Sequence, residues 1–259
     1  MRLQNKVIIV TGSTMGIGKA IAQRCVAEGA RVVLHGLEEN LGRELLSSIG
    51  ADNAALHITD VTSPGAPERL VNFALKNFGG IDALVNNAAW VVSSDINTTD
   101  LAFLRKVLEV NTIAPFALIR SALPHLKKNK GCVLNIGSVN AWGGEPNLLA
   151  YSISKGALMT MTRNLGDSLF RQAGVRINQI NPGWVLTEKE IQRKKEHGLK
   201  EDWYTEIPEL FAPAGKLLSP AEIASAAVYW LSDESGPVSG QVVDLEQYPL
   251  LGRNPPKDW

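Results

Sequence analysis

Residues 7–18 read VIIVTGSTMGIG, four apolar residues that run directly into a turn with three glycines. The apolar run has the length and composition of a buried strand, and a helical pattern begins at Ile17. The glycines permit a tight turn and a close approach of the backbone to a bound group. A phosphate there would meet the unpaired N–H groups of the helix N-terminus and the positive end of its dipole. Alone, the motif also fits an ordinary strand-to-helix turn, so the rest of the chain must decide.

The same alternation continues along the chain, because short apolar runs are followed by segments of helical period, the pattern of βα units around a parallel sheet. Strands are expected at residues 7–10, 31–35, 54–58, 83–86, 132–136, 176–180 and 241–244. Helices are expected at residues 17–28, 39–48, 68–78, 101–127, 151–172 and 221–231. The sequence therefore predicts an α/β fold of the doubly wound Rossmann type with a seven-stranded parallel sheet.

A single domain is expected over residues 1–248, because no run rich in Pro, Gly or Ser divides the chain and no internal repeat is present. Residues 184–218 break the βα rhythm with a long, polar segment rich in bulky residues, which is typical of a substrate lid. Residues 249–259 are rich in proline and form a predicted C-terminal tail, either frayed or laid across a neighbouring subunit.

The charge balance argues against two classes of partner. Lys plus Arg equals Asp plus Glu at 26 each, so no net field favours a nucleic-acid backbone or an anionic membrane surface. No stretch approaches the roughly 18 apolar residues of a membrane span, and the first apolar run is too short for a secretory signal. Cys25 and Cys132 are too few for a disulfide framework and are interpreted as buried thiols in a reducing cytoplasm. No metal site is expected.

Four further motifs follow the glycine turn in order. They are Asn86-Asn87-Ala88-Ala89 after the fourth strand, Ser138 after the fifth, Tyr151-Ser152-Ile153-Ser154-Lys155 opening a helix, and Pro182-Gly183 after the sixth strand. With TGSTMGIG at 11–18, this ordered set resembles the short-chain dehydrogenase/reductase family over about residues 6–244. The resemblance implies an enzyme that moves a hydride between a nicotinamide dinucleotide and a hydroxyl or carbonyl carbon. Ala89 departs from the family, which usually has Gly there, but removes no hydrogen-bond donor.

The resemblance places the cofactor on loops at the carboxyl ends of the strands. The implied cofactor-binding residues are Gly12, Ser13, Thr14, Met15, Gly16, Ile17, Gly18, Gly36, Leu37, Asp60, Val61, Asn87, Ala88, Ala89, Tyr151, Lys155, Pro182, Gly183, Val185 and Thr187. Among them, the Val185 backbone and the Thr187 hydroxyl are implied to bind the nicotinamide carboxamide, and Asp60-Val61 to contact adenine. A plain Pro-Gly turn at 182–183 and a helix-capping role for Asp60 are the alternatives.

The end of the second strand bears on the choice between NAD and NADP, because an acid there binds the ribose 2′-hydroxyl and a base accommodates a 2′-phosphate. This chain has neither: Gly36 stands at the usual acid position, and Leu37 and Met15 stand where arginines often bind the phosphate. Glu38 and Glu39 would repel a phosphate dianion, so the sequence favours NAD, with NADP as the alternative. These two glutamates are interpreted as first-turn acids that complement a helix dipole, rather than as ribose ligands.

Tyr151 and Lys155 are one helical turn apart, so their side chains lie on one face of a helix and the ammonium can approach the phenol. A phenol with a pKa near 10 becomes a base at neutral pH only if the phenolate is stabilised by roughly 4 kcal/mol. A close ammonium and the positive charge of the oxidised nicotinamide are expected to provide this. Taken alone, the pair also fits a surface tyrosine and a solvated lysine.

Ser138 lies at the carboxyl edge of the sheet, where its hydroxyl can donate to the substrate oxygen as charge develops there. The resemblance implies that Lys155 also binds the nicotinamide ribose, and that Asn111 holds a water that relays protons to Lys155. Ser138 alone would fit a loop hydroxyl, and Asn111 alone a helix-surface polar group. The ordered set of motifs favours the catalytic interpretation.

The substrate is expected to contact residues just after these motifs and in the lid. The candidates are Ser138, Asn140, Trp142, Glu145, Trp184, Trp90, His197, Trp203 and Tyr204. Indole rings beside Asn and Glu side chains suit the apolar face and hydroxyl edges of a sugar or polyol, and core or lid packing explains the aromatic residues as well. His197 is interpreted as an exposed lid residue rather than a catalytic one.

The sequence thus predicts a sugar or polyol dehydrogenase that uses NAD and acts on a small molecule. One alternative is reduction of a 3-oxoacyl thioester or another ketone with NADPH, which needs a phosphate-binding base that the second strand lacks. Another is a catalytically silent, cofactor-sensing binding protein, against which the intact Ser138, Tyr151 and Lys155 argue. The resemblance also implies a homotetramer, or a dimer, built through the helices at 101–127 and 151–172 and the last strand.

Overall fold

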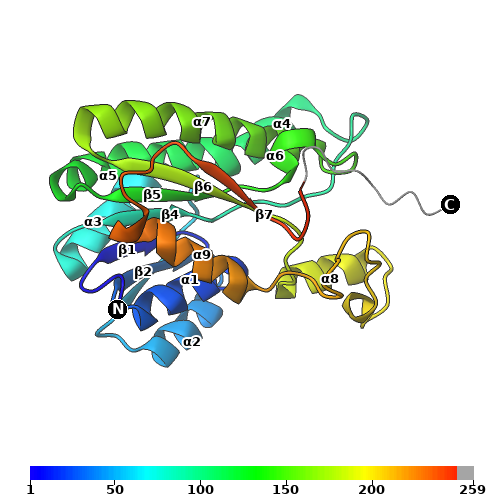
Figure 1. The fold of residues 1–259 in the computed structure, drawn as a ribbon, viewed down its shortest axis with the longest axis horizontal. Coiled ribbons are helices and arrows are strands. Elements are labelled where there is room, and N and C mark those ends of the chain that lie inside the picture. The colour runs from blue at the N-terminus through cyan, green and yellow to red at the C-terminus, as the bar shows by residue number, and fades with distance from the viewer. Residues whose placement is uncertain (250–259) are drawn as a thin grey trace.

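The computed structural model describes residues 1–249 and has seven parallel strands in one sheet (Figure 1). The strands are β1 (Val7–Val10), β2 (Arg31–Gly36), β3 (Ala54–Ile58), β4 (Ala83–Asn86), β5 (Cys132–Ile136), β6 (Arg176–Pro182) and β7 (Val242–Leu245). Their order across the sheet is β3-β2-β1-β4-β5-β6-β7, so the direction of winding reverses between β1 and β4. In such sheets, ligands bind at the carboxyl ends of the strands beside that reversal. The predicted doubly wound fold is confirmed.

Helices cover both faces of this sheet (Figure 1). The helices described within residues 1–249 are α1 (Gly16–Ala27), α2 (Glu39–Ile49), α3 (Ala66–Phe78), α4 (Leu101–Leu108), the π-helix η1 (Glu109–Ile113), α5 (Ala114–Asn129), α6 (Asn140–Gly143), α7 (Leu149–Ala173), α8 (Glu188–Glu196) and α9 (Pro220–Leu231), with short 3₁₀ turns η2 (Trp203–Thr205) and η3 (Asp233–Ser235). The core clusters place α1, α2 and α9 on one face, and α3, α5 and α7 on the other.

Two apolar clusters, one on each face, join these layers to the sheet. Ile8 and Val10 of β1 belong to the same cluster as Ile21 of α1 and Val228 of α9. Ile9, between them in sequence, belongs to the cluster formed with α3, α5 and α7. Successive side chains of a strand point to opposite faces, and a strand buried on both faces therefore reads as a continuous apolar run. This burial fixes the carboxyl ends of the strands, and with them the loops that carry the site.

The structure departs from the prediction within the helix expected at 101–127. That segment consists of α4, η1 and α5, because five residues around Asn111 wind as a π-helix. Single π turns inside α-helices are frequent at functional sites. The apolar period of the sequence does not reveal such a short change of winding.

The predicted lid, residues 184–218, contains a regular helix that the sequence analysis missed. Thr187 begins α8 by accepting a hydrogen bond from the Glu190 N–H at 3.1 Å. Acids occupy the first turn of α8 and bases its last turn, which stabilises a short helix through its dipole. In Figure 1, α8 and its loop project beyond the sheet at the end to which the strand arrows point.

The end of the predicted tail, from residue 250 onward, lies outside the described residues. Between residues 1 and 249, no helix combines the length and the apolar character that a bilayer crossing demands.

Candidate active site

The glycine turn and the loop after β4 form one platform. The Thr11 hydroxyl oxygen accepts hydrogen bonds from the N–H groups of Asn87 and Ala88, each at 3.0 Å. The Asn87 side-chain amide donates to the carbonyls of Thr11 and Gly12 at 2.9 and 3.0 Å. Gly12 has a φ of 62°, and a Cβ on it would lie 2.9 Å from Cα of Ala88. Glycine is therefore required there by both conformation and space, and two of the predicted motifs are joined.

The N-terminus of α1 opens onto this platform in a form that suits an anion. Met15 is its N-cap residue, makes no side-chain capping hydrogen bond, and is followed by a first turn without acids. A Cβ on Gly18 would lie 2.2 Å from the carbonyl oxygen of Gly12, so the helix and the turn approach as closely as backbone allows. The first-turn N–H groups are thus left for a phosphate. These residues fit the pyrophosphate of a dinucleotide.

His35, which the sequence analysis did not single out, ties β2 to the glycine turn. Its carbonyl accepts from the Ser13 N–H at 2.7 Å, its N–H donates to the Ser13 hydroxyl at 2.9 Å, and its Nδ1 accepts from the Gly12 N–H at 3.4 Å. Burial, with a smaller contribution from the neighbouring His57, lowers the pKa of His35 to about 4. The imidazole is therefore neutral at physiological pH and can accept this hydrogen bond.

The end of β2 has no room for a side chain at position 36. A Cβ on Gly36 would lie 2.5 Å from both Cγ2 and Oγ1 of Thr14. The Thr14 hydroxyl donates to Oε2 of Glu38 at 2.7 Å, and Lys189 of α8 donates to the other carboxylate oxygen at 2.9 Å. Leu37, by contrast, is exposed.

This arrangement corrects the interpretation of Glu38. Glu38 is the N-cap of α2, but its side chain makes no capping hydrogen bond; only Glu39 lies in the first turn, paired with Arg43. Burial would raise the pKa of Glu38, but the hydrogen bonds from Thr14 and Lys189 outweigh burial and lower it to about 2. Glu38 is therefore an ionised acid that faces the glycine turn.

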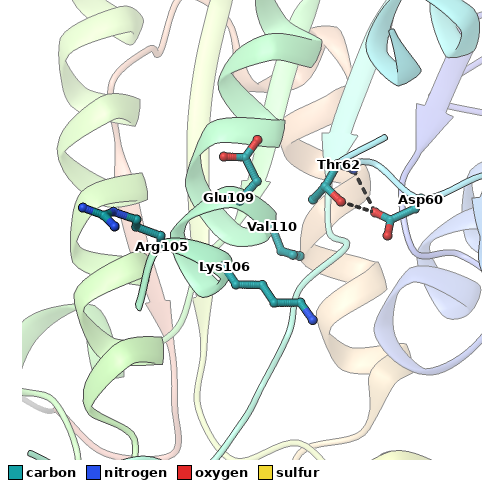
Figure 2. A pocket seen from close by; sticks show the side chains of 6 residues that line it. All are labelled: Asp60, Thr62, Arg105, Lys106, Glu109 and Val110. Atoms are coloured by element: carbon teal, nitrogen blue, oxygen red, sulfur yellow. Dashed lines mark hydrogen bonds between the residues drawn. The ribbon is translucent and has the colours of Figure 1, made fainter. Parts of the chain in front are cut away.

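A pocket of about 300 Å³ lies between the loop after β3 and the junction of α4 with η1. Figure 2 shows its lining residues, which are Asp60, Thr62, Arg105, Lys106, Glu109 and Val110. Asp60 accepts from the backbone and the hydroxyl of Thr62 at 2.8 and 2.7 Å, and these bonds lower its pKa. Asp60 therefore stabilises its own loop and caps no helix, since Gly65 is the N-cap of α3. The sequence analysis named Asp60 as an adenine contact and did not name Lys106 of α4 or Val110 of η1, which are distant from Asp60 in the sequence.

Tyr151, Lys155 and Ser138 converge at the carboxyl edge of the sheet. Tyr151 and Lys155 lie on one face of α7, and the Lys155 ammonium nitrogen is 5.6 Å from the centroid of the Tyr151 ring. Ser138, just after β5, lies close enough to the Tyr151 hydroxyl to lower the pKa of that phenol. Lys155 donates to the carbonyl oxygen of Ile136 at 2.7 Å. All three predicted residues are thus brought together and are buried.

Burial dominates the acid–base properties of this pair. It raises the pKa of Tyr151 to about 12, although the hydrogen bond to Ser138 and the positive charge of Arg193 act in the opposite direction. Burial also lowers the pKa of Lys155 to about 7. Burial by the folded chain therefore opposes the stabilisation of the phenolate that is expected from Lys155 and an oxidised nicotinamide, because a dry environment disfavours both charges. A neutral, buried phenol can still donate a proton.

Asn111 is buried in the π-helix and is held by three hydrogen bonds. Its side-chain oxygen accepts from the Trp90 N–H at 2.8 Å, and its amide nitrogen donates to the Trp90 carbonyl at 3.1 Å and to the Ser154 hydroxyl at 3.0 Å. Ser154 directly precedes Lys155 on α7. Asn111 thus connects the loop after β4 with the helix that carries the two titratable residues.

The turn after β6 leads into the lid and places a charged pair above the site. The Trp184 indole N–H donates to Glu190 at 2.8 Å, and Glu190 forms a two-point ion pair with Arg193 at 2.8 and 2.9 Å. The Trp184 ring stacks on Trp203 with centroids 5.4 Å apart. Both charges act on the Tyr151 phenol, Arg193 lowering its pKa and Glu190 raising it. The sequence analysis missed this pair, although Thr187 and Glu190 have the spacing of an N-terminal cap.

Of the other predicted substrate residues, some lie beside Ser138 and others make contacts elsewhere. Asn140 lies beside the site, since its N–H donates to the Ser138 hydroxyl at 3.2 Å and its amide donates to Glu145 at 3.4 Å. Trp142 instead donates its indole N–H to Asp244 of β7 at 2.9 Å. The Trp90 ring lies against two residues of α4, Phe103 and Lys106. The remaining lid candidates are His197, which is exposed, and Tyr204, which packs edge-on against Trp203.

The chain is similar to known oxidoreductases. A family model described as enoyl-(acyl carrier protein) reductase matches residues 12–246. L-fucose dehydrogenase of Mus musculus is 35% identical over 237 residues, which cover 90% of this chain and 84% of that protein. Glucose 1-dehydrogenase 2 of Bacillus subtilis is 35% identical over 253 residues and 94% of both chains. The NADP-dependent (R)-specific alcohol dehydrogenase of Lentilactobacillus kefiri is 33% identical over 249 residues, 90% of this chain and 92% of that protein.

The match of the family model over most of the chain agrees with the ordered motifs and with the sheet topology. Within residues 1–249, no cluster of three or more His, Cys, Asp or Glu side chains could hold a metal ion. The chain belongs to the short-chain dehydrogenase/reductase family.

Proposed function

We propose that this protein is an NAD-dependent dehydrogenase of a sugar or polyol in which Tyr151 transfers the proton. Family membership makes the chain an oxidoreductase that acts on CH–OH groups with a nicotinamide dinucleotide. The proposal adds the substrate class, the choice of NAD and the role of each residue. The proposal rests on one observation: Ser138, Tyr151 and Lys155 converge at the edge of the sheet that also carries the glycine turn.

A dinucleotide bound on the glycine turn would supply or accept the hydride. Toward a carbonyl substrate, the neutral phenol of Tyr151 donates its proton to the substrate oxygen, and Ser138 donates a hydrogen bond to the same oxygen as negative charge grows there. In the opposite direction, Tyr151 accepts the proton of a substrate hydroxyl. Protonated Lys155 and the positive charge of the oxidised nicotinamide stabilise the phenolate that this requires.

Lys155 is also proposed to hold the nicotinamide ribose, and Asn111 to position a water that passes protons toward Lys155. The hydrogen bond between Asn111 and Ser154 supports this role, because it holds the π-helix against the part of α7 that carries Lys155. The backbone of Val185 is proposed to contact the nicotinamide carboxamide. Val185 forms a β-bridge with Leu218, and the two hydrogen bonds of this bridge use the Trp184 carbonyl and the Leu186 N–H. They do not use the N–H or the carbonyl of Val185 itself, which supports the proposed contact.

Two features of the lid favour a substrate with several hydroxyl groups. Glu190 and Arg193 have side chains that are 13% and 23% exposed, and beyond the ion pair that joins them the carboxylate and the guanidinium keep further acceptor and donor capacity near Tyr151. The stacked rings of Trp184 and Trp203 provide an apolar wall of the kind that packs against a sugar ring. Two of the relatives described above are named as dehydrogenases of sugars.

Initial rates over a panel of substrates test the proposal. The purified protein is given sugars, polyols, hydroxy acids and secondary alcohols with NAD or NADP, and 3-oxoacyl thioesters with NADH or NADPH. We expect turnover of a sugar or polyol with NAD. Activity confined to acyl thioesters would contradict the substrate class. Dinucleotide binding without turnover of any compound would favour the silent, cofactor-sensing alternative.

We also propose a homotetramer, or a dimer, built through the two long helical segments. Large apolar side chains are exposed on these segments, at Leu101, Ile113, Phe116 and Ile153. Such side chains on neighbouring helices favour burial against another copy. The organisation of residues 1–248 as one domain with a lid at 184–218, and the location in the cytoplasm, stay predictions.

A further inference from the structure

Ser138 is held by hydrogen bonds at both its backbone and its hydroxyl. Its N–H donates to Oδ1 of Asn181 at 3.2 Å, and its hydroxyl oxygen accepts from the Asn140 N–H at 3.2 Å. A hydroxyl oxygen that accepts one hydrogen bond still has its own proton to donate. The Ser138 proton is therefore left for the substrate oxygen, as the proposed mechanism requires.

Both supports of Ser138 lead to one carboxylate, that of Asp244 on β7. Oδ1 of Asp244 accepts from the Asn181 side-chain amide at 2.9 Å and from the Trp142 indole N–H at 2.9 Å. Asn181 lies opposite Asp244 on the neighbouring strand β6. Trp142 follows Asn140 in the same short helix, α6. A single oxygen atom on the last strand of the sheet thus fixes the groups on both sides of Ser138.

Asp244 also determines which way the Asn181 amide faces. A carboxylate only accepts hydrogen bonds, so it binds the NH₂ group of Asn181 and turns the amide oxygen toward the Ser138 N–H. The Gln179 side-chain amide donates to the same oxygen at 2.7 Å. Gly137 leaves room for that oxygen, since a Cβ there would lie 2.1 Å from Oδ1 of Asn181. An amide turned the other way would place two donors against each other and leave the Ser138 N–H unsatisfied.

The packing of the sheet does not account for these polar side chains. Gln179 and Asn181 are fully buried and lie on the same face of β6 as Ile177, a residue of the apolar cluster beside α7. A polar side chain is costly to bury unless it is hydrogen-bonded, and apolar residues would fill these positions without that cost. What the polar residues add is an acceptor for the Ser138 N–H.

We propose that Asp244 is a positioning residue for the reaction, which holds Ser138 through Asn181 on one side and through α6 on the other. It fixes the direction from which the Ser138 hydroxyl donates to the substrate oxygen beside Tyr151. Asp244 acts only through these neighbours. The inference deepens the proposed function, on which it rests, by naming the group that orients the hydroxyl.

A double-mutant cycle with Ser138→Ala tests whether Asp244 acts through Ser138. Asp244→Ala should lower kcat on the substrate that the panel identifies by about 10- to 100-fold, because a small misplacement of a reacting group is costly. The dissociation constant of NADH, measured by fluorescence titration, should change little. Ser138→Ala alone should lower kcat by about 10²- to 10³-fold. In that background Asp244→Ala should change kcat by less than about threefold, since the hydroxyl that it positions is already absent.

Three further variants separate the hydrogen bonds from the rest of the side chain. Asp244→Asn keeps an oxygen that can accept from both donors and should recover most of kcat. Trp142→Phe removes only the indole N–H and should lower kcat less than Asp244→Ala, again only while Ser138 is present. Asp233→Ala is the control, because it removes an exposed acid that pairs with Lys6, and it should leave kcat unchanged. The Trp142→Phe cycle decides the question if Asp244→Ala fails to fold.

Hydrogen exchange of the Ser138 amide in the full chain, without cofactor or substrate, gives a readout that does not depend on turnover. Exchange should be faster in Asp244→Ala than in the wild type or Asp233→Ala, because the acceptor on Asn181 is no longer held in place. Unchanged exchange, an unchanged kcat, or an equal loss of kcat with and without the Ser138 hydroxyl would overturn the inference. Failure of the wild type to turn over any compound of the panel would instead overturn the proposed function.

Discussion

The ammonium nitrogen of Lys155 lies 5.6 Å from the centroid of the Tyr151 ring and donates a hydrogen bond to the Ile136 carbonyl at 2.7 Å. Both residues are buried, and burial moves each toward its neutral form: the pKa of the phenol rises to about 12 and that of the amine falls to about 7. The folded chain therefore holds a protonated phenol beside an amine that titrates near neutral pH. Formation of the phenolate additionally requires positive charge, which an oxidised nicotinamide would supply.

The lowered pKa of Lys155 predicts how stability depends on pH. The folded protein holds this proton only up to about pH 7, whereas an ordinary lysine holds it to 10.5. Between these values the unfolded state binds more protons, so the contribution of Lys155 to the free energy of unfolding rises with pH, by up to about 1.4 kcal/mol per unit. Urea unfolding of the wild type and Lys155→Met at pH values from about 6 to 9 measures this.

The difference in unfolding free energy, wild type minus Lys155→Met, should increase over that range. Lys195→Met, which removes an exposed lysine paired with Glu201, provides a control for the loss of a lysine side chain. A difference for Lys155→Met that does not change with pH would mean that Lys155 titrates as an ordinary lysine.

Gly36→Ala should destabilise the protein by about 1–3 kcal/mol, because the new Cβ would lie 2.5 Å from two side-chain atoms of Thr14. Adding Thr14→Ala should restore part of the loss, since it removes both of those atoms. Gly143→Ala serves as a control, because a Cβ at Gly143 would have no neighbour within 4 Å among the described residues. Urea unfolding compares the four chains. Equal stability of Gly36→Ala and wild type would show that Thr14 does not occupy this space.

Phe116→Glu should disrupt the proposed oligomer. Phe116 on α5 is 45% exposed, so a charge there should leave the fold of one chain intact and disfavour an apolar interface. Ile96→Glu is a matched control, because Ile96 is 80% exposed and lies outside both long helical segments. Light scattering after size exclusion should give a smaller mass for Phe116→Glu alone. A monomeric wild type would contradict the proposed assembly.

The sequence predicted what depends on local pattern. Strands such as β1 and β4 were placed correctly because they are buried on both faces. A strand of this kind appears in the sequence as a short, nearly continuous apolar run. The glycine turn and the Tyr151–Lys155 pair were recognised because their spacing along the chain sets their geometry. The site residues that were missed depend on contacts between distant segments.

Glu38 illustrates that limit. Its hydrogen bond to Lys189 depends on where the lid packs, and no spacing along the chain encodes that position. Burial of Tyr151 is a second effect of this kind: it raises the pKa of the phenol, and no spacing along the chain encodes it. Asn111 was predicted as a site residue, but the π-helix that turns it toward Trp90 and Ser154 leaves no mark in the apolar period.

The role of Tyr151 as the proton-transferring residue is tested most directly by Tyr151→Phe, which removes one hydroxyl and keeps the ring. NADH affinity is measured by fluorescence titration and turnover by initial rates on the substrate that the panel identifies. We expect the dissociation constant for NADH to change little and turnover to fall by about 10²- to 10⁴-fold. Near-normal turnover of Tyr151→Phe would contradict the account.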